Sequence, residues 1–220
     1  MKKMEKASLI PEEQKQHLID EFIEKLVNPV RLVMFTQEVE CQFCSETRRL
    51  IGELASLSDK IKVEVYDFVG DNEKARGLGI EKIPALAIMG DKDYGMRFYG
   101  FPYGYEFRTL VDAVLLASNG KTGLAEETKL RVREITVPVT IQVFVTLTCP
   151  HCSPAATTAY QFAVENGLIR AEIIEANEFP HLAMKYSVMG VPKIVVNDKV
   201  EFVGAIPENL FLDQILLATR

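Results

Sequence analysis

The sequence lacks any long apolar run: no hydrophobic stretch in its 220 residues approaches the roughly 20 that are needed to cross a bilayer. It also lacks positive charge overall, because its net charge is −6 and its pI is near 5.3. This charge argues against a general binder of nucleic acids or of anionic membranes. Near the N-terminus, Pro11-Glu12-Glu13-Gln14-Lys15-Gln16 stands where a signal peptide needs an apolar segment. We therefore expect a cytoplasmic protein whose 48% hydrophobic residues build a substantial core.

Cysteine is scarce as well, and all four cysteines lie in two Cys-x-x-Cys units. We name Cys41-Gln42-Phe43-Cys44 the first centre and Cys149-Pro150-His151-Cys152 the second centre. Each centre follows an apolar, β-branched run (residues 30–35 and 139–145) and precedes a helix-like segment. A strand that delivers two cysteines to a helix N-terminus places the first sulfur where free N–H groups and the helix dipole favour a thiolate. The predicted chemistry is dithiol–disulfide exchange.

The two centres belong to an internal repeat. Cys41 and Cys149 are 108 positions apart, and Pro84 and Pro192 are separated by the same 108 positions. After each proline the sequence predicts a strand, a turn and a second strand that ends in glycine. Chance does not account for this agreement of cysteines, proline, strands and glycine. We interpret the chain as a tandem duplication whose copies have diverged.

Periodicity and turn residues predict the same order of elements in both copies. In the first copy, a helix after Pro11 is followed by strand 30–36, helix 43–57, strand 62–66, a short helix at 72–76, hairpin 85–100 and helix 104–118. In the second copy, the elements are helix 124–133, strand 138–145, helix 153–166, strand 169–174, helix 178–186, hairpin 192–204 and helix 207–218. The turn-forming segment 119–123 is the expected hinge between them.

This order of elements resembles the thioredoxin fold, and two copies in one chain resemble the protein disulfide oxidoreductases of hyperthermophilic archaea and bacteria, relatives of glutaredoxins and protein disulfide isomerase. The resemblance covers nearly the whole chain and rests on the two cysteine pairs, the prolines at 84 and 192, and the glycines at 100 and 204. It implies an α/β fold of two tandem thioredoxin-fold units, each a central mixed sheet flanked by helices. We expect these units at residues 1–119 and 120–220, with no metal or organic cofactor needed at the centres.

The resemblance also assigns a role to the two prolines. In the thioredoxin fold this proline is cis and faces the cysteines, and the residue before it offers backbone groups to an extended substrate. We carry this role over to Ile83-Pro84 and Val191-Pro192 as expected substrate-binding residues. A cis X-Pro bond is accessible because it costs only about 0.5–1 kcal/mol.

Two departures from thioredoxin itself stand out. Thioredoxins carry a buried Asp on the strand before the cysteines, whereas the matching positions here hold Met34 and Val143. Water or a distant carboxylate must therefore accept the proton of Cys44 and Cys152. The tryptophan that often precedes a thioredoxin cysteine pair is absent too, since the chain has no tryptophan. These absences favour the glutaredoxin or isomerase side of the family.

The residues around the two centres predict unequal chemistry. His151, if protonated, puts a positive charge near Cys149, and Pro150 can occupy the first helical position. Glu38 and Glu40 stand before the first centre, where their negative charges oppose thiolate formation. We therefore expect Cys149 to be the more acidic nucleophile and its pair to be the stronger oxidant.

The predicted function is thiol–disulfide oxidoreductase activity on protein disulfides, through reduction, oxidation or isomerisation. The thiolate of Cys149 or Cys41 attacks a substrate disulfide, and Cys152 or Cys44 then resolves the mixed disulfide. The expected partners are disulfide-containing proteins and, by family resemblance, an NADPH-linked thioredoxin reductase, with no nucleic acid or membrane involved.

Three other interpretations compete with this one. Four cysteines could bind a structural Zn²⁺ ion, but the 104 residues between Cys44 and Cys149 would have to bring the pairs together, and the repeated proline would have no role. The pairs could be structural disulfides, although closing so short a loop gains little entropy. A redox-inactive scaffold or chaperone that binds extended chains beside the prolines is the main alternative from another class.

Overall fold

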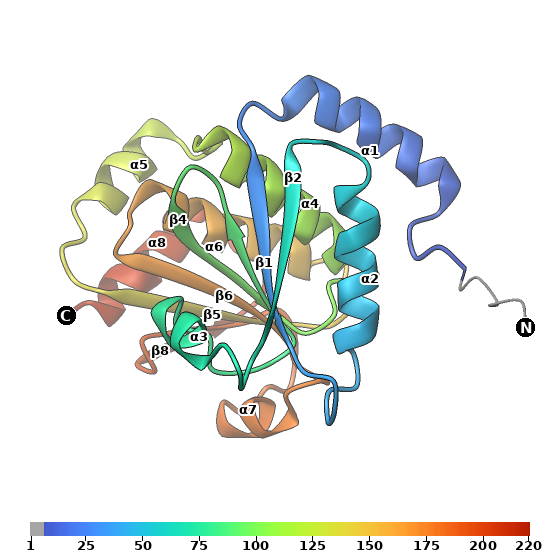
Figure 1. Ribbon diagram of the computed structural model, residues 1–220. Coiled ribbons are helices and arrows are strands. Elements are labelled where there is room, and N and C mark those ends of the chain that lie inside the picture. The colour runs from blue at the N-terminus through green and yellow to red at the C-terminus, as the bar shows by residue number, and fades with distance from the viewer. Residues whose placement is uncertain (1–6) are drawn as a thin grey trace, which may run out of the picture.

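The structure is a computed structural model that describes residues 7–220. Its elements follow the predicted order in both halves (Figure 1). The first half contains α1 (Glu12–Lys25), β1 (Val30–Thr36), α2 (Cys44–Ala55), β2 (Ile61–Asp67), α3 (Asn72–Gly77), β3 (Ala85–Met89), β4 (Asp93–Tyr99) and α4 (Glu106–Asn119). The second half contains α5 (Glu126–Arg133), β5 (Val139–Val145), α6 (Cys152–Glu165), β6 (Ile169–Glu175), α7 (Pro180–Lys185), β7 (Lys193–Val196), β8 (Val200–Val203) and α8 (Glu208–Ala218).

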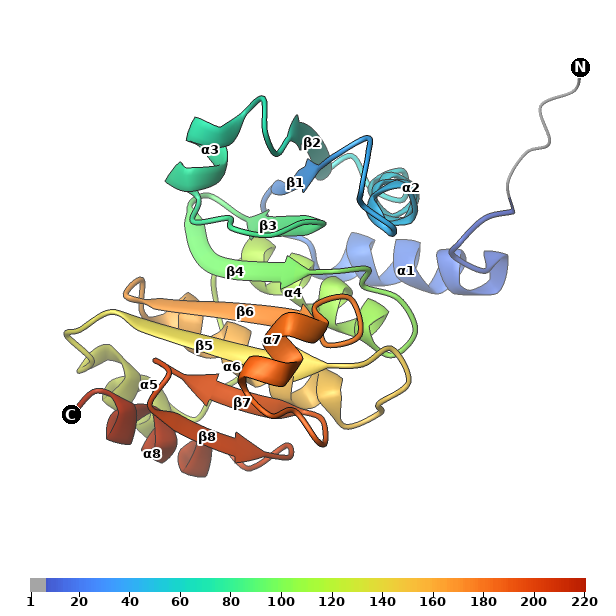
Figure 2. The same cartoon turned by 90° about the horizontal axis from the view of Figure 1, so that it is seen from below.

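The strands form one mixed sheet in the order β2-β1-β3-β4-β6-β5-β7-β8 (Figure 2). Each half thus repeats the same local order of four strands, as a tandem pair of thioredoxin-fold units requires. The halves join where β4 pairs in parallel with β6, from Met96 opposite Ala171 to Tyr99 opposite Ile174. The two sheets expected from the sequence are therefore continuous with each other.

Alternation along the strands divides the core between the two faces of the sheet. On β1, Leu32 and Met34 belong to the larger cluster, which also holds buried apolar residues of α1, α2, α4, α6 and α8. Val33 and Phe35 point the other way, into a smaller cluster with residues of α3 and α7. The helices that begin at the cysteines therefore pack on the larger face, and the short helices before the prolines cover the opposite face.

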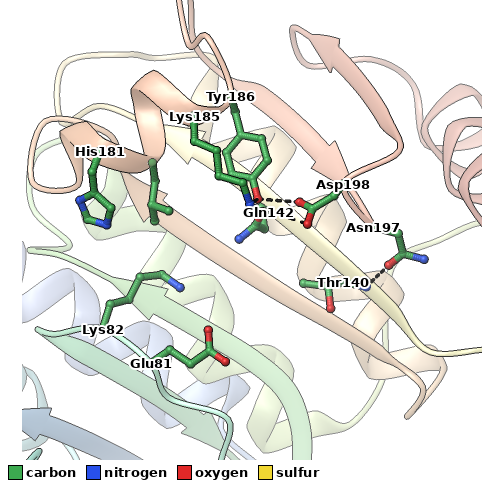
Figure 3. Close-up of a pocket in the computed structure, with 10 residues that line it drawn as sticks. Glu81, Lys82, Thr140, Gln142, His181, Lys185, Tyr186, Asn197 and Asp198 are labelled. Atoms are coloured by element: carbon green, nitrogen blue, oxygen red, sulfur yellow. Dashed lines mark hydrogen bonds and ion pairs between the residues drawn. The ribbon is translucent and has the colours of Figure 1, made fainter.

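A polar cavity of about 580 Å³ lies on that opposite face between the two units (Figure 3). Glu81 and Lys82 reach it from the first unit, and Lys185 and Asp198 reach it from the second. Lys82 Nζ lies 3.4 Å from a carboxylate oxygen of Glu172 on β6, which makes an ion pair across the junction.

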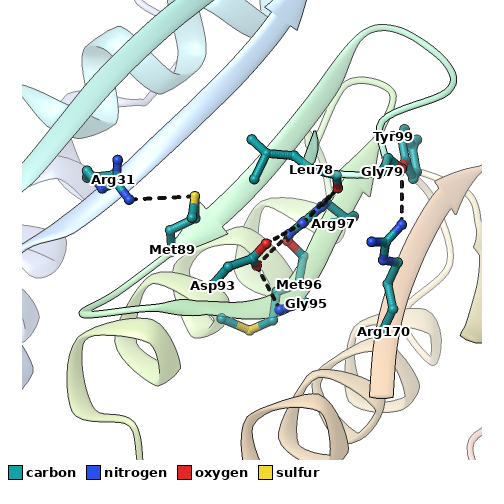
Figure 4. A network of polar contacts seen from close by, with 10 residues as sticks. All are labelled: Arg31, Leu78, Gly79, Met89, Asp93, Gly95, Met96, Arg97, Tyr99 and Arg170. Atoms are coloured by element: carbon teal, nitrogen blue, oxygen red, sulfur yellow. Dashed lines mark hydrogen bonds and ion pairs between the residues drawn. The ribbon is translucent and has the colours of Figure 1, made fainter. Parts of the chain in front are cut away.

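The loop between α3 and the proline of the first unit is anchored to the sheet by two arginines (Figure 4). Buried Arg97 donates from Nε and Nη2 to the carbonyl oxygen of Leu78 at 3.1 and 2.9 Å, and it also pairs with Asp93. Arg170 of β6 donates to the carbonyl oxygen of Gly79 at 3.2 Å. Charge-assisted bonds of this kind are stronger than neutral ones, so they hold the loop that carries Pro84 in place.

The segment between the halves begins where α4 ends at Asn119, and Gly120 closes that helix in the left-handed conformation, with φ of 59°. Such a glycine is a common C-terminal stop of a helix. The boundary at residues 119 and 120 stays a prediction. In the part of the chain that the structure describes, no helix is both long and apolar enough to span a membrane.

Candidate active site

The second centre lies where β5 ends and α6 begins. Cys149 is half-buried in the connecting loop, and Cys152 is buried as the first residue of α6. His151 caps this helix and is exposed to solvent. Pro150 stands outside the helix, so its predicted place at the first helical position is wrong. The reason is the turn that precedes the helix, in which the Cys152 N–H donates to the Cys149 carbonyl oxygen at 3.4 Å.

The proline loop faces this centre. The Val191–Pro192 peptide bond is cis, and Cys149 Sγ lies 3.7 Å from the carbonyl oxygen of Val191 as its hydrogen-bond donor. Pro192 is buried, whereas Val191 is partly exposed and therefore accessible beside the sulfur. The predicted cis geometry is confirmed here, and the predicted neighbours of Cys149 are brought together.

The first centre repeats this arrangement at the start of α2. Cys41 and Cys44 form a disulfide, and Cys44 is the first residue of the helix. The Ile83–Pro84 bond is also cis. Glu38 and Glu40 lie exposed in the preceding loop, and Glu40 has a left-handed backbone with φ of 62°.

Both centres lie at the same end of the sheet, just after the carboxyl ends of β1 and β5. β1 and β5 point the same way, because β1 and β4 are each antiparallel to β3, β4 is parallel to β6, and β6 is parallel to β5. Three strands separate β1 from β5, which corresponds to roughly 19 Å at the usual strand spacing. Across residues 7–220, no group of three or more His, Cys, Asp or Glu side chains is placed to hold a metal ion. The two cysteine pairs lie apart, at the ends of different strands of the sheet.

A buried carboxylate that no sequence motif indicated, Glu106, lies next to the loop that leads to the second centre. Glu106 is the first residue of α4 and has no exposed surface. One of its oxygens accepts a hydrogen bond from Thr109 Oγ1 at 2.8 Å, and the other has no partner among the described residues. The residue before it is tied to the second unit, since the Tyr105 N–H donates to the carbonyl oxygen of Leu147, two positions before Cys149.

The electrostatics connect this carboxylate to the resolving cysteine. Burial raises the pKa of the Glu106 carboxyl to about 7, and the charge of Glu175 adds to that rise. The pKa of Cys152 is also raised, first by burial, then by its hydrogen bond with Cys149, and in part by the charge of Glu106. Glu106 is therefore a candidate acceptor for the proton of Cys152, directly or through one bridging water, because its carboxyl titrates near neutrality and its charge acts on this buried thiol.

A sequence signal for Glu106 exists in its own helix. The repeat gives none, because the last helix of each copy begins with a glutamate, Glu106 of α4 and Glu208 of α8. An acidic residue on the side of α4 that also carries Leu110 and Val114 is unexpected for a helix packed on a core. What the sequence does not show is that the last helix of one unit begins beside the cysteines of the other.

Fold and site together define a double thioredoxin-fold protein with two dithiol–disulfide centres. A thioredoxin-domain family model matches residues 139–217. The crystal structure of a protein disulfide oxidoreductase from Aeropyrum pernix K1 is 32% identical and superposes with a TM-score of 0.87, covering 93% of this chain and 91% of that one. A thioredoxin from Methanocaldococcus jannaschii is 37% identical over 78 residues, which are 35% of this chain and 92% of that protein.

A third relative is considerably longer. It is a component of the alkyl hydroperoxide reductase of Escherichia coli K12, and it is 29% identical over 178 residues, which cover 81% of this chain but 32% of that protein. The chain thus spans about a third of the length of this curated relative. The present chain belongs to the family of thioredoxin-fold disulfide oxidoreductases.

Proposed function

We propose that the protein catalyses thiol–disulfide exchange on the disulfides of other proteins, through both of its centres. The observation that carries this proposal is the second centre, where Cys149 Sγ lies 3.7 Å from the carbonyl oxygen of Val191 and next to a cis proline. This half-buried sulfur lies at the end of a strand and has partly exposed backbone beside it. An extended chain can pair with that backbone while the sulfur attacks its disulfide. Ile83 and Pro84 take the corresponding role at the first centre.

The proposed reaction has two steps at the second centre. The Cys149 thiolate attacks one sulfur of the substrate disulfide, forms a mixed disulfide, and releases the other substrate sulfur as a thiolate. Cys152 then gives its proton to the Glu106 carboxylate and attacks Cys149 Sγ. The second substrate sulfur leaves as a thiolate, so the substrate is reduced by two electrons and the Cys149–Cys152 pair is oxidised.

The two centres are proposed to divide the work. His151 favours the thiolate of Cys149, while Glu38 and Glu40 disfavour that of Cys41. Because a stable thiolate stabilises the reduced form, the second centre is proposed to be the stronger oxidant and to behave more like glutaredoxin or protein disulfide isomerase. The proposed location is the cytoplasm, where paired cysteines are more often catalytic than structural.

The electron donor is proposed to be a reductase that regenerates the dithiols. Curated relatives include proteins whose names contain alkyl hydroperoxide reductase and NADH dehydrogenase, and these names support a reductase-linked supply of electrons. An NADPH-linked thioredoxin reductase is the specific donor that we propose. No metal or organic cofactor is part of the proposed chemistry.

Insulin reduction by dithiothreitol tests this function, with precipitation of the released chain as the readout. The wild-type protein should accelerate precipitation, Cys41→Ser should keep most of the rate, and Cys149→Ser should lose most of it. The double variant should match the reaction without protein. A wild-type protein that binds reduced insulin without accelerating its reduction would instead identify a scaffold or chaperone.

A further inference from the structure

A groove of about 670 Å³ opens beside the second centre, between α7 and the loop that leads to Pro192. None of the residues that line it, all within the described part of the chain, carries a charge. Two long apolar side chains that line this groove are exposed to solvent: Met184 is 74% exposed and Met189 is 95% exposed. Exposed apolar side chains gathered in one hollow are typical of a binding surface.

The groove reaches the residue that contacts the reacting sulfur. Val191 lines it, and the carbonyl oxygen of the same residue lies 3.7 Å from Cys149 Sγ. A polypeptide whose cysteine is joined to Cys149 must therefore pass beside Val191. A side chain close to that cysteine then reaches the groove, so its occupant is part of the substrate that reacts at this centre.

The internal repeat shows that the first unit has no such groove lining. The match of 108 positions holds through this region, because α3 (Asn72–Gly77) corresponds residue by residue to α7 (Pro180–Lys185). The left-handed residues Gly79 and Ser187 that follow these helices also correspond, with φ of 63° and 48°.

At the matched positions, the second unit has apolar side chains where the first unit has charged ones. Met184 corresponds to Arg76 and Met189 corresponds to Glu81. The next position is Gly190 in the second unit and Lys82 in the first. Figure 3 shows Glu81 and Lys82 at the polar cavity between the units, where Lys82 also lies 3.7 Å from the ring centre of Tyr99.

We propose that the Met184–Met189 groove binds an apolar side chain of the disulfide-bearing polypeptide, so that the second centre selects cysteines within apolar segments and the first centre does not. This inference rests on the proposed exchange activity of Cys149. Such cysteines are exposed in incompletely folded chains, in which core segments are still accessible.

The chemistry of methionine suits this role. Its unbranched, polarisable side chain adapts to partners of different shape, which a surface that meets many sequences requires. Partial burial of one leucine-sized side chain is expected to favour reaction of an apolar peptide about tenfold, equivalent to about 1.4 kcal/mol.

The test uses the full chain with Cys41→Ser and Cys44→Ser, so that only the second centre reacts. The probes are two eight-residue peptides, each with one cysteine in a mixed disulfide with 2-nitro-5-thiobenzoate. Leucines flank the cysteine in one peptide, and serines flank it in the other. Attack of Cys149 on the peptide sulfur forms the enzyme–peptide disulfide, breaks the original S–S bond, and releases the coloured thiolate. Its release rate, divided by the rate with neutral hydroxyethyl disulfide, is the readout.

The leucine peptide should react about ten times faster than the serine peptide. Exchanging the two methionines for the residues of the first unit, Met184→Arg with Met189→Glu, should bring that ratio close to one. The matched control, Met184→Leu with Met189→Leu, should keep it. A protein with Cys149→Ser and Cys152→Ser, which reacts only at the first centre, should also give a ratio near one.

Two results would overturn the inference while leaving the exchange activity intact. One is equal rates for the two peptides in the parent protein, and the other is an unchanged preference after the Arg and Glu exchange. Failure of the proposed function looks different, because the parent would then react with neither the peptides nor hydroxyethyl disulfide. Thermal unfolding of each variant shows whether it is folded, which substitution of such exposed side chains should permit.

Discussion

A carboxylate with no exposed surface and one oxygen without a hydrogen-bond partner is costly to ionise, because burial removes the water that would stabilise its charge. Glu106 is in this position, and its carboxyl accordingly has a pKa of about 7. Near neutral pH it therefore exists in both protonation states. This is the property that a group needs in order to take the proton of Cys152 and then release it again.

The same shift predicts how Glu106 changes stability with pH. Its pKa is about 7 in the folded protein, against 4.5 as the ordinary value. Below pH 4.5 both states are protonated, and as pH rises toward 7 only the unfolded state gains charge. The folded state therefore loses about 3 kcal/mol of relative stability over this range. Glu106→Gln should remove that loss.

Urea unfolding at several pH values measures this effect. The unfolding free energy of Glu106→Gln, relative to wild type, should rise by about 3 kcal/mol between pH 4.5 and pH 7. Glu175 and Glu178 also have raised pKa values through burial, but they are present in both proteins, so the difference reports Glu106 and its coupling to the charge of Glu175. A difference that does not change with pH would contradict the assignment.

Among the elements, the segment from Gly100 to Glu106 connects the two centres. The N–H of Gly100 donates to the carbonyl oxygen of Pro84 at 2.9 Å, at the proline loop of the first centre. The ring of Phe101 stacks on Phe43 of that centre. At its other end, the segment delivers Glu106 to the second centre. A short loop is thus held by one unit and supplies a side chain to the other.

Glu178 of the second unit clamps this segment, because it accepts a hydrogen bond from the Phe101 N–H at 2.7 Å. We expect Glu178→Ala to lower the unfolding free energy by about 1–3 kcal/mol and to slow the second step at Cys152 several-fold. Glu178→Gln keeps an acceptor oxygen and should restore both properties. Chemical unfolding and stopped-flow measurement of the second step provide the readouts.

The matched control for this clamp is Glu53, whose carboxylate accepts the N–H groups of Leu9 and Ile10 at 2.8 and 3.0 Å. Glu53→Ala should lower stability without changing the reaction at Cys152. If it slows the reaction as much as Glu178→Ala does, the effect reports general loosening of the fold rather than positioning of Glu106.

At the level of the elements, most of the helices and strands can be predicted from local sequence. The apolar, β-branched run at 30–35 locates β1 to within a few residues, because composition and turn chemistry are local. The pairing of β4 with β6 is not local, since it joins two strand edges that lie far apart in the chain. The place of Glu106 depends on that pairing, and for this reason the sequence alone left the proton acceptor unknown.

For the molecule as a whole, one continuous sheet places both centres at the same ends of its strands. The strand spacing puts them roughly 19 Å apart. Disulfide exchange needs sulfurs in contact, since bonded cysteines have Cα atoms within about 7 Å. The centres therefore react with substrates separately rather than with each other. Their properties should be measurable one at a time.

Glutathione titration of the single-centre proteins tests this separation. The second centre, measured with Cys41→Ser and Cys44→Ser in place, should have the higher potential, by roughly 30 mV for each 1.4 kcal/mol of thiolate stabilisation. His151→Ala should make this centre more reducing, by an amount that salt reduces because His151 is exposed. Equal potentials of the two centres would show that the neighbouring charges do not set the difference.

The central claim is that Cys152 resolves the mixed disulfide by giving its proton to Glu106, and one measurement tests it most directly. Reduced protein carrying Cys41→Ser and Cys44→Ser is mixed with a glutathione-linked peptide, quenched with acid at successive times, and analysed by mass spectrometry for the Cys149–peptide adduct. Glu172→Gln, which alters a buried carboxylate of β6 on the opposite face, is the control. With Glu106→Gln the adduct should persist at least about a hundredfold longer, and the pH dependence near 7 should flatten. An adduct that decays as quickly as in the parent and control proteins would contradict the account.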